Sequence, residues 1–127
     1  MRTDATLSST LSEIYDSPSF AERIKAAQLR VNLDDSEMKE IINQYIEDTP
    51  EMFKNLNTAW VKSNHDDIFL YAHSIVGVAR ILKLDEVSRY AKAVEQMAKE
   101  RKRSDKETLK LLNEHHNASL EALRKYY

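Results

Sequence analysis

His73 and Gly77 are the two residues of this chain whose types and spacing most clearly indicate chemistry. They lie one helical turn apart, inside a stretch whose apolar residues repeat with the period of a helix. A neutral imidazole can act as a nucleophile, whereas a glycine inside a helix costs about 1 kcal/mol relative to alanine. Gly77 is the only glycine of the sequence, and the apolar pattern continues past it to Leu82, so it does not end the helix. The absent side chain predicts that something large approaches His73.

The helix that must carry His73 is expected over residues 66–82. At about 100° per residue, its apolar stripe turns toward the rest of the fold, and His73 points away from that stripe. The stripe consists of Ile68, Ala72, Ile75, Ala79 and Leu82. The residues expected beside His73 on the outer, solvent-accessible side are Phe69, Leu70, Val76, Gly77 and Arg80. An exposed apolar collar indicates a protein-binding patch, so we expect these outer residues to dock a protein partner.

The other histidines have simpler interpretations. His116 lies on the apolar stripe of the last expected helix, which favours a histidine satisfied at the edge of the core over a metal ligand. His65 lies in a connection, and His115 borders a polar face. Adjacent helical positions diverge by about 100°, so His115 and His116 do not form a metal pair. Since the sequence also has no phosphate-binding loop, nucleophile elbow or zinc motif, we expect no metal and no ATP-binding site.

Composition favours an all-helical protein. A chain of 127 residues with Gly 1, Pro 2 and 31% charged residues has few residues suited to tight turns, which argues against sandwiches, barrels and doubly wound sheets. The net charge of -2 gives no general nucleic-acid footprint. The absence of cysteine fits a reducing compartment, and no apolar run reaches the length of about 20 residues that spans a membrane. We expect a cytoplasmic monomer that binds neither nucleic acid nor membranes.

Helix starts are marked by sequences of the capping-box type. These lie at residues 10–13, 19–22, 34–37 and 104–107. Proline resists an interior helical position, so Thr49-Pro50 predicts an interruption between two helices. The expected architecture is an antiparallel up-down four-helix bundle over residues 34–127, preceded by an extension of short helices, residues 1–33, that packs on the bundle.

Residues 71–79, with the sequence Tyr-Ala-His-Ser-Ile-Val-Gly-Val-Ala, resemble the centre of the histidine-containing phosphotransfer (HPt) domain family of two-component phosphorelays. The family typically shows an alanine-histidine pair, a lysine three residues on, and then glycine. Residues 84–87 and 93–95 are similar to its next helix, and residues 45–51 to the segment before its histidine helix. The resemblance extends over about residues 33–127.

This resemblance implies a four-helix bundle and a role in signal transduction. It implies that His73 accepts a phosphoryl group from the aspartyl phosphate of one receiver domain and passes it to another. The partners would be receiver domains of a hybrid histidine kinase or a response regulator. The chain would be a phosphocarrier and not an enzyme, without a cofactor of its own, because the receiver binds the Mg²⁺.

Val76 departs from the family pattern, since it occupies the position of the usual lysine. Arg80 lies one turn further along the same outer face, and we expect it to stabilise the phosphoryl group instead. Val76 also keeps an alternative open, in which the chain is a non-phosphorylated docking module for receiver domains or kinases. A third interpretation is a helical interaction domain unrelated to phosphorelay, with His73 an incidental surface residue.

Overall fold

The computed structural model describes residues 11–126. Residues 11–15 are helical and precede five longer helices. These are α2 (Pro18–Arg30), α3 (Asp35–Val61), α4 (His65–Ile81), α5 (Asp85–Lys99) and α6 (Lys106–Tyr126). No strand occurs within residues 11–126, so the all-α prediction is confirmed, while the capping residue expected at Thr10 lies outside the described range. No helix in that range is long and apolar enough to cross a membrane.

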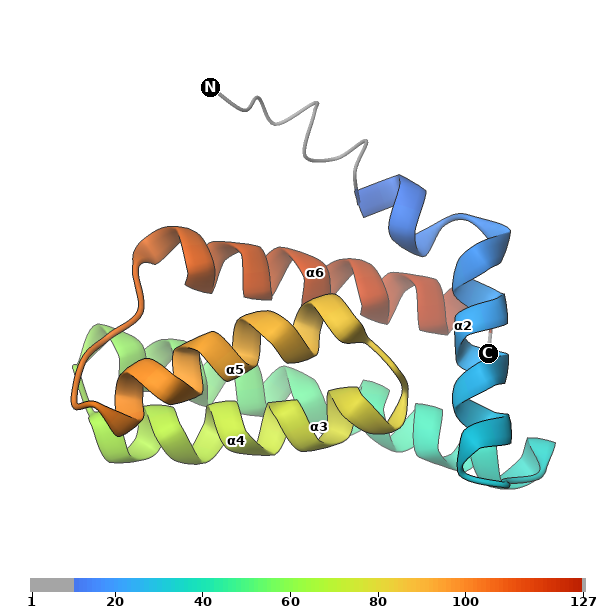
Figure 1. Ribbon diagram of the computed structural model, residues 1–127, viewed down its shortest axis with the longest axis horizontal. Coiled ribbons are helices and arrows are strands. Elements are labelled where there is room, and N and C mark those ends of the chain that lie inside the picture. The colour runs from blue at the N-terminus through green and yellow to red at the C-terminus, as the bar shows by residue number, and fades with distance from the viewer. Residues whose placement is uncertain (1–10, 127) are drawn as a thin grey trace.

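The four longer helices α3 to α6 pack side by side (Figure 1). Each contacts the next along the chain, and α3 also contacts α6, which closes the ring. The connections from α3 to α4 and from α4 to α5 cover only residues 62–64 and 82–84. Such short connections force consecutive helices to run antiparallel, as the colour gradient of Figure 1 shows. The helix that carries His73 is therefore flanked by α3 and α5.

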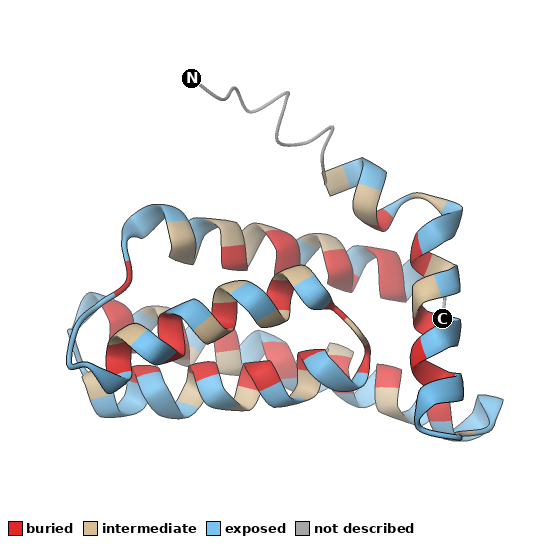
Figure 2. Cartoon of the chain, in the orientation of Figure 1, coloured by how far each residue is buried: buried red, intermediate tan, exposed pale blue. Residues whose placement is uncertain are grey.

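Buried residues line the faces that these helices turn toward one another (Figure 2). The stripe expected for α4 is confirmed, because each of its five members is 0% exposed. Full burial of one such isoleucine or leucine contributes about 1.5–3 kcal/mol to folding. The stripe therefore fixes the rotation of α4 about its own axis, and with it the direction in which His73 points.

Pro50 lies inside α3, and the predicted interruption at Thr49-Pro50 is wrong. Proline in a helix removes one backbone donor and costs about 3 kcal/mol. Pro50 lies on the exposed side of α3, and the buried Thr49 beside it donates its hydroxyl to the Tyr45 carbonyl at 2.6 Å. Met38 and Phe53, on either side of the proline, are both buried in the same core. Packing along the whole helix therefore outweighs the local preference of the proline.

The capping sequences are partly confirmed. At α3, the Asp34 carboxylate accepts from the Glu37 backbone N–H at 2.8 Å, and the Glu37 carboxylate accepts from the Asp34 N–H at 3.0 Å. At α6 the capping side chain is Asp105, not Ser104, and it accepts from the Thr108 N–H at 2.6 Å. The box expected at residues 19–22 is wrong, because α2 begins at Pro18 without a side-chain cap.

The helices end without glycine. Asn32, Ser63, Lys83 and Arg101 follow successive helices and have positive φ angles between 53° and 62°. The residue after each returns its N–H to the last turn, as Leu84 does to the Ala79 carbonyl at 2.9 Å. This geometry is the one that usually selects glycine. Side-chain-bearing residues adopt it here, which explains how a chain with one glycine still makes short connections.

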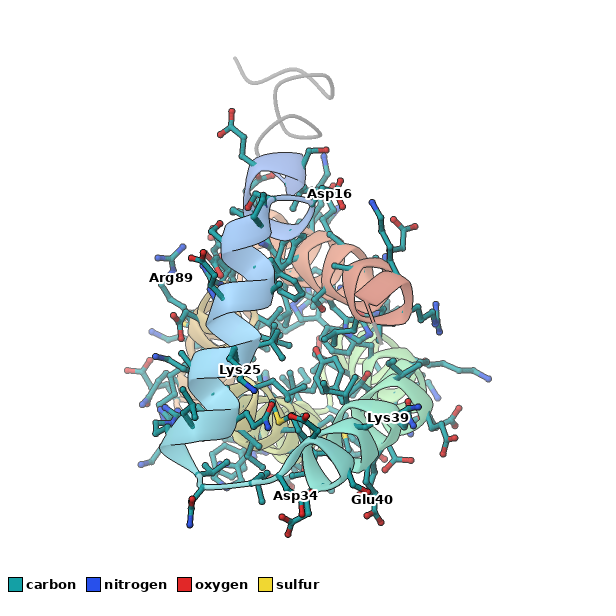
Figure 3. The ribbon with its side chains drawn as sticks, turned by 90° about the vertical axis from the view of Figure 1, so that its right-hand side faces the viewer. Asp16, Lys25, Asp34, Lys39, Glu40 and Arg89 are labelled. Carbon is teal, nitrogen blue, oxygen red and sulfur yellow. The ribbon has the colours of Figure 1, made fainter. Side chains whose placement is uncertain are left out.

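Helix α2 crosses the end of the bundle, as Figure 1 shows from the side and Figure 3 from that end. Its apolar face joins the same core as the bundle helices. Arg23 pairs with Glu86 at the start of α5 at 2.7 Å, and Arg30 donates to the Arg80 carbonyl at the end of α4 at 2.6 Å. Residues 11–33 thus pack on the bundle, while their treatment as a separate extension stays a prediction.

Candidate functional site

His73 lies at the middle of α4 with its side chain 66% exposed. Its Nδ1 is 2.9 Å from Oε1 of Glu95 on α5. On its other side the imidazole stacks on Phe69, with ring centroids 5.7 Å apart and an interplanar angle of 10°. These two contacts hold the plane of the ring. The predicted exposure of His73 is confirmed, and Nε2 is the nitrogen left for an incoming molecule.

Glu95 is the buried member of this pair, with only 5% of its side chain exposed. Burial opposes ionisation, but hydrogen bonds from His73 and from Lys92, at 3.2 Å, outweigh it, so the pKa of Glu95 lies below its ordinary value. An ionised carboxylate only accepts hydrogen bonds. In the neutral form of His73, the contact with Glu95 therefore favours the tautomer with the proton on Nδ1 and the lone pair on Nε2. This is the arrangement in which a neutral histidine is a nucleophile.

Gly77 lies on the exposed side of α4, one turn beyond His73. A Cβ atom added at Gly77 would meet nothing within 4 Å. The internal packing of the chain therefore does not require a glycine here. That Gly77 clears space for a partner stays a prediction. Because the surface at Gly77 is open, a larger side chain there can be tested without disturbing the internal packing.

Val76 corrects the predicted outer surface, because it is only 3% exposed and belongs to the core. The prediction that it lies on the docking surface is wrong. A single narrow stripe underestimates the buried sector of a helix that packs against two neighbours, and α4 contacts both α3 and α5. The valine in place of the expected lysine thus fills core volume.

The remaining outer residues lie where the sequence placed them. Leu70 is 55% exposed, Phe69 is 36% exposed, and Arg80 is exposed. Arg80 is seven positions beyond His73, which corresponds to about 10 Å along the helix axis. Its assignment as the phosphate-stabilising residue stays a prediction, as does the docking role of the apolar pair.

His116 and His115 are both buried. His116 stacks on Phe53 with centroids 3.7 Å apart, and burial lowers its pKa to about 4, so its place in the core is confirmed. The expectation that it is satisfied there is wrong, because its Nε2 has no hydrogen-bond partner. The expectation that His115 borders a polar face is wrong, because Tyr15 reaches its Nδ1 at 2.9 Å inside the fold. Within residues 11–126, no group of three or more His, Asp or Glu side chains is placed to hold a metal ion.

Glu95 and Lys92 are the functional candidates that the sequence did not reveal. A signal was present, since Glu95 lies among the apolar positions of its helix, one turn from both Ala91 and Ala98. An acid at a core-facing position indicates a buried partner. Choosing His73 as that partner required the register between α4 and α5, which helical periodicity alone does not provide.

A comparison with protein families adds one finding. A family model described as Hpt domain matches residues 40–126 of the chain. The match includes all of α4 and α5, and therefore His73, Glu95 and Lys92. No significant match is found among curated proteins or among solved structures.

Proposed function

Because the chain belongs to the Hpt domain family, whose members carry out histidine phosphotransfer in two-component systems, we propose that it shuttles phosphoryl groups through His73 between receiver-domain aspartates of a multistep phosphorelay. One observation carries this proposal. His73 is exposed while its Nδ1 is held by the buried carboxylate of Glu95 at 2.9 Å. A histidine that is incidental to function does not need this support on one nitrogen and free access to the other.

In the first transfer, the Nε2 lone pair of His73 attacks the phosphorus of an aspartyl phosphate. The N–P bond forms while the P–O bond to the aspartate breaks, and the aspartate leaves as a carboxylate. The imidazole keeps its Nδ1 proton and becomes positively charged, and the carboxylate of Glu95 stabilises that charge. In the second transfer, a carboxylate oxygen of the next receiver attacks phosphorus, and the N–P electron pair returns to Nε2.

The partner supplies the rest of the chemistry. Phosphoryl transfer depends mainly on positioning and on neutralisation of charge, and the Mg²⁺ held by the receiver provides neutralisation on its side. The proposed docking surface consists of Phe69, Leu70, Gly77 and Arg80 around His73. Arg80 adds positive charge at one edge of this surface, where it can face the phosphoryl group or an acidic residue of the receiver.

Hpt domains are phosphocarriers and not kinases. We propose that this chain likewise depends on an upstream receiver, such as that of a hybrid histidine kinase, and acts as a monomer in the cytoplasm. Its lack of cysteine fits that reducing compartment. The buried Val76 favours a second candidate, a docking module that binds receivers or kinases without transfer, because α4 offers no cation one turn from His73.

Incubation with a receiver labelled on its aspartyl phosphate tests the proposal. We expect acid-labile label on the wild-type protein, no label on His73→Gln, and unchanged label on His65→Gln, the matched control at the start of α4. Binding of receivers without any label supports the docking module. Failure to bind any receiver of the host contradicts both functions.

A further inference from the structure

Lys92, Glu95 and His73 form a continuous chain of polar contacts between α5 and α4. The Lys92 Nζ is 3.2 Å from Oε2 of Glu95, and the other carboxylate oxygen, Oε1, is 2.9 Å from Nδ1 of His73. The side chain of Glu95 is 5% exposed, whereas that of Lys92 is 42% exposed. The carboxylate therefore lies inside the fold, and the ammonium lies at its rim on the side of the reactive imidazole.

The register of the two helices determines where this ammonium lies. Helices α4 and α5 run antiparallel, and His73 lies opposite Glu95. One turn back along α5 is Lys92, which is therefore level with the residue one turn forward along α4, Val76. Val76 is buried and uncharged. At this level of the α4–α5 hairpin, the positive charge is therefore carried by Lys92 of α5.

A carboxylate beside the reactive histidine has two opposite effects. It orients the imidazole and stabilises the charge that develops on the ring. The incoming phosphoryl group is itself negative, with a charge of about −1.5 to −2, so an uncompensated Glu95 repels it at short range. A cation bound to the second carboxylate oxygen lowers this repulsion and leaves the hydrogen bond to Nδ1 in place.

We propose that Lys92 is a positioning residue for phosphoryl transfer, which acts by balancing the charge of Glu95 beside His73. The proposal rests on the proposed phosphorylation of His73. Lys92 keeps Glu95 ionised as an acceptor for Nδ1–H and lowers the repulsion that the carboxylate exerts on the phosphoryl group. The function of Lys92 therefore depends on Glu95, and removal of the carboxylate removes the need for the lysine.

Phosphoramidate provides a test that needs no receiver. In this reaction, Nε2 of His73 attacks phosphorus, the N–P bond to the imidazole forms, and the original P–N bond breaks with release of ammonia. Loading rates are measured by ³¹P NMR for wild type, Lys92→Met, Glu95→Gln and the double variant. Lys110→Met is the matched control, since it removes a lysine from another Lys–Glu pair, Lys110–Glu114 on α6.

We expect Lys92→Met to load about fivefold more slowly, as loss of one charge-assisted contact at a partly exposed site implies. In the Glu95→Gln background, the same substitution changes the rate by less than about twofold, because no carboxylate remains to be balanced. Lys92→Arg restores the wild-type rate. The effect of Lys92→Met shrinks at high salt, and Lys110→Met loads like wild type.

Two results overturn this role of Lys92: an unchanged loading rate in Lys92→Met, or an equal slowing in the presence and absence of the Glu95 carboxylate. Circular dichroism on each variant identifies a slowing that is caused by loss of fold, and such a slowing appears equally in both backgrounds. If the wild-type protein loads from phosphoramidate but exchanges phosphoryl groups with no receiver, the proposed relay is contradicted. The loading rates of the Lys92 variants can still be compared in that case. A wild-type protein that takes no phosphoryl group on His73 overturns both proposals.

Discussion

At the scale of residues, the proposed chemistry depends on how the two nitrogens of His73 are used. Glu95 engages Nδ1 at 2.9 Å and Phe69 stacks on the ring, so the reactive nitrogen is selected by its surroundings. The charge state of Glu95 is equally determined by its neighbours, because its pKa is lowered against the effect of its own burial. The two residues thus have separate roles in the proposed transfer: the buried carboxylate orients the ring, and the exposed imidazole offers the reacting nitrogen.

Glu95→Gln tests this division, because the amide keeps the shape of the side chain and loses its charge. Glutamine can still accept from Nδ1–H, but it stabilises the charged ring less, by about 1 kcal/mol. We expect phosphoryl transfer from a receiver to slow about fivefold, while receiver binding stays unchanged. Transfer reactions that are quenched at successive times can be followed on phosphate-affinity gels. An unchanged rate shows that the Glu95 contact does not contribute to catalysis.

At the scale of elements, α4 must both pack and present a surface. Its buried sector extends to Val76, and Gly77 lies on the opposite side over open space. The helix would be more stable with a side chain at Gly77, and nothing inside the molecule prevents one. The glycine therefore fits the proposal that a bound partner occupies the space beside His73.

Substitutions at Gly77 separate the needs of the helix from those of the partner. Gly77→Ala should raise the free energy of unfolding by about 0.5–1 kcal/mol, as measured by urea denaturation, because alanine favours the helix. Gly77→Leu should also fold, because the added side chain meets open space. We expect Gly77→Leu to slow transfer from a receiver at least tenfold, on the order of the cost of one steric clash in an interface. A wild-type transfer rate for Gly77→Leu contradicts the clearance role.

The elements were largely predictable from the sequence, whereas contacts between them were not. Periodicity identified the buried stripe of α4 and the exposure of His73, since both follow from the geometry of a single helix. Pro50 was misjudged because its local cost is offset by core packing along all of α3. Val76 was misjudged because the buried width of α4 depends on its two neighbours. Glu95 was missed for the same kind of reason, since the register between helices is a tertiary property.

At the scale of the whole molecule, the core contains a histidine that links folding to pH. Burial lowers the pKa of His116 from 6.5 to about 4, and its Nε2 has no hydrogen-bond partner. Between these two pH values the unfolded chain binds more protons than the folded one, so stability falls as pH falls from 6.5 toward 4. Glu86 and Glu95 act in a lower range. Their pKa values lie below 4.5, so the stability that they add is present above 4.5 and is lost as pH falls through the folded values.

His116→Phe tests the upper range, because phenylalanine keeps the stacking on Phe53 and cannot take up a proton. The wild-type free energy of unfolding should fall by about 3 kcal/mol between pH 7 and pH 4 through His116 alone. The variant should lose this part of the pH dependence, and His65→Gln should retain it. Urea denaturation at several pH values provides the measurement. Equal slopes for wild type and His116→Phe contradict the assignment.

The proposed reactive centre is contained in one hairpin, α4 and α5, which spans residues 65–99. Helix α2 crosses one end of the bundle, and Arg30 and Arg23 contact that hairpin where α4 ends and α5 begins. Phe20, Ile24 and Ala27 of α2 are buried in the shared core, so substitutions at its exposed positions are the ones that leave the packing of the hairpin unchanged. In evolutionary terms, the proposed chemistry is encoded in one contiguous stretch of sequence, while the exposed positions of the adjoining helix can vary.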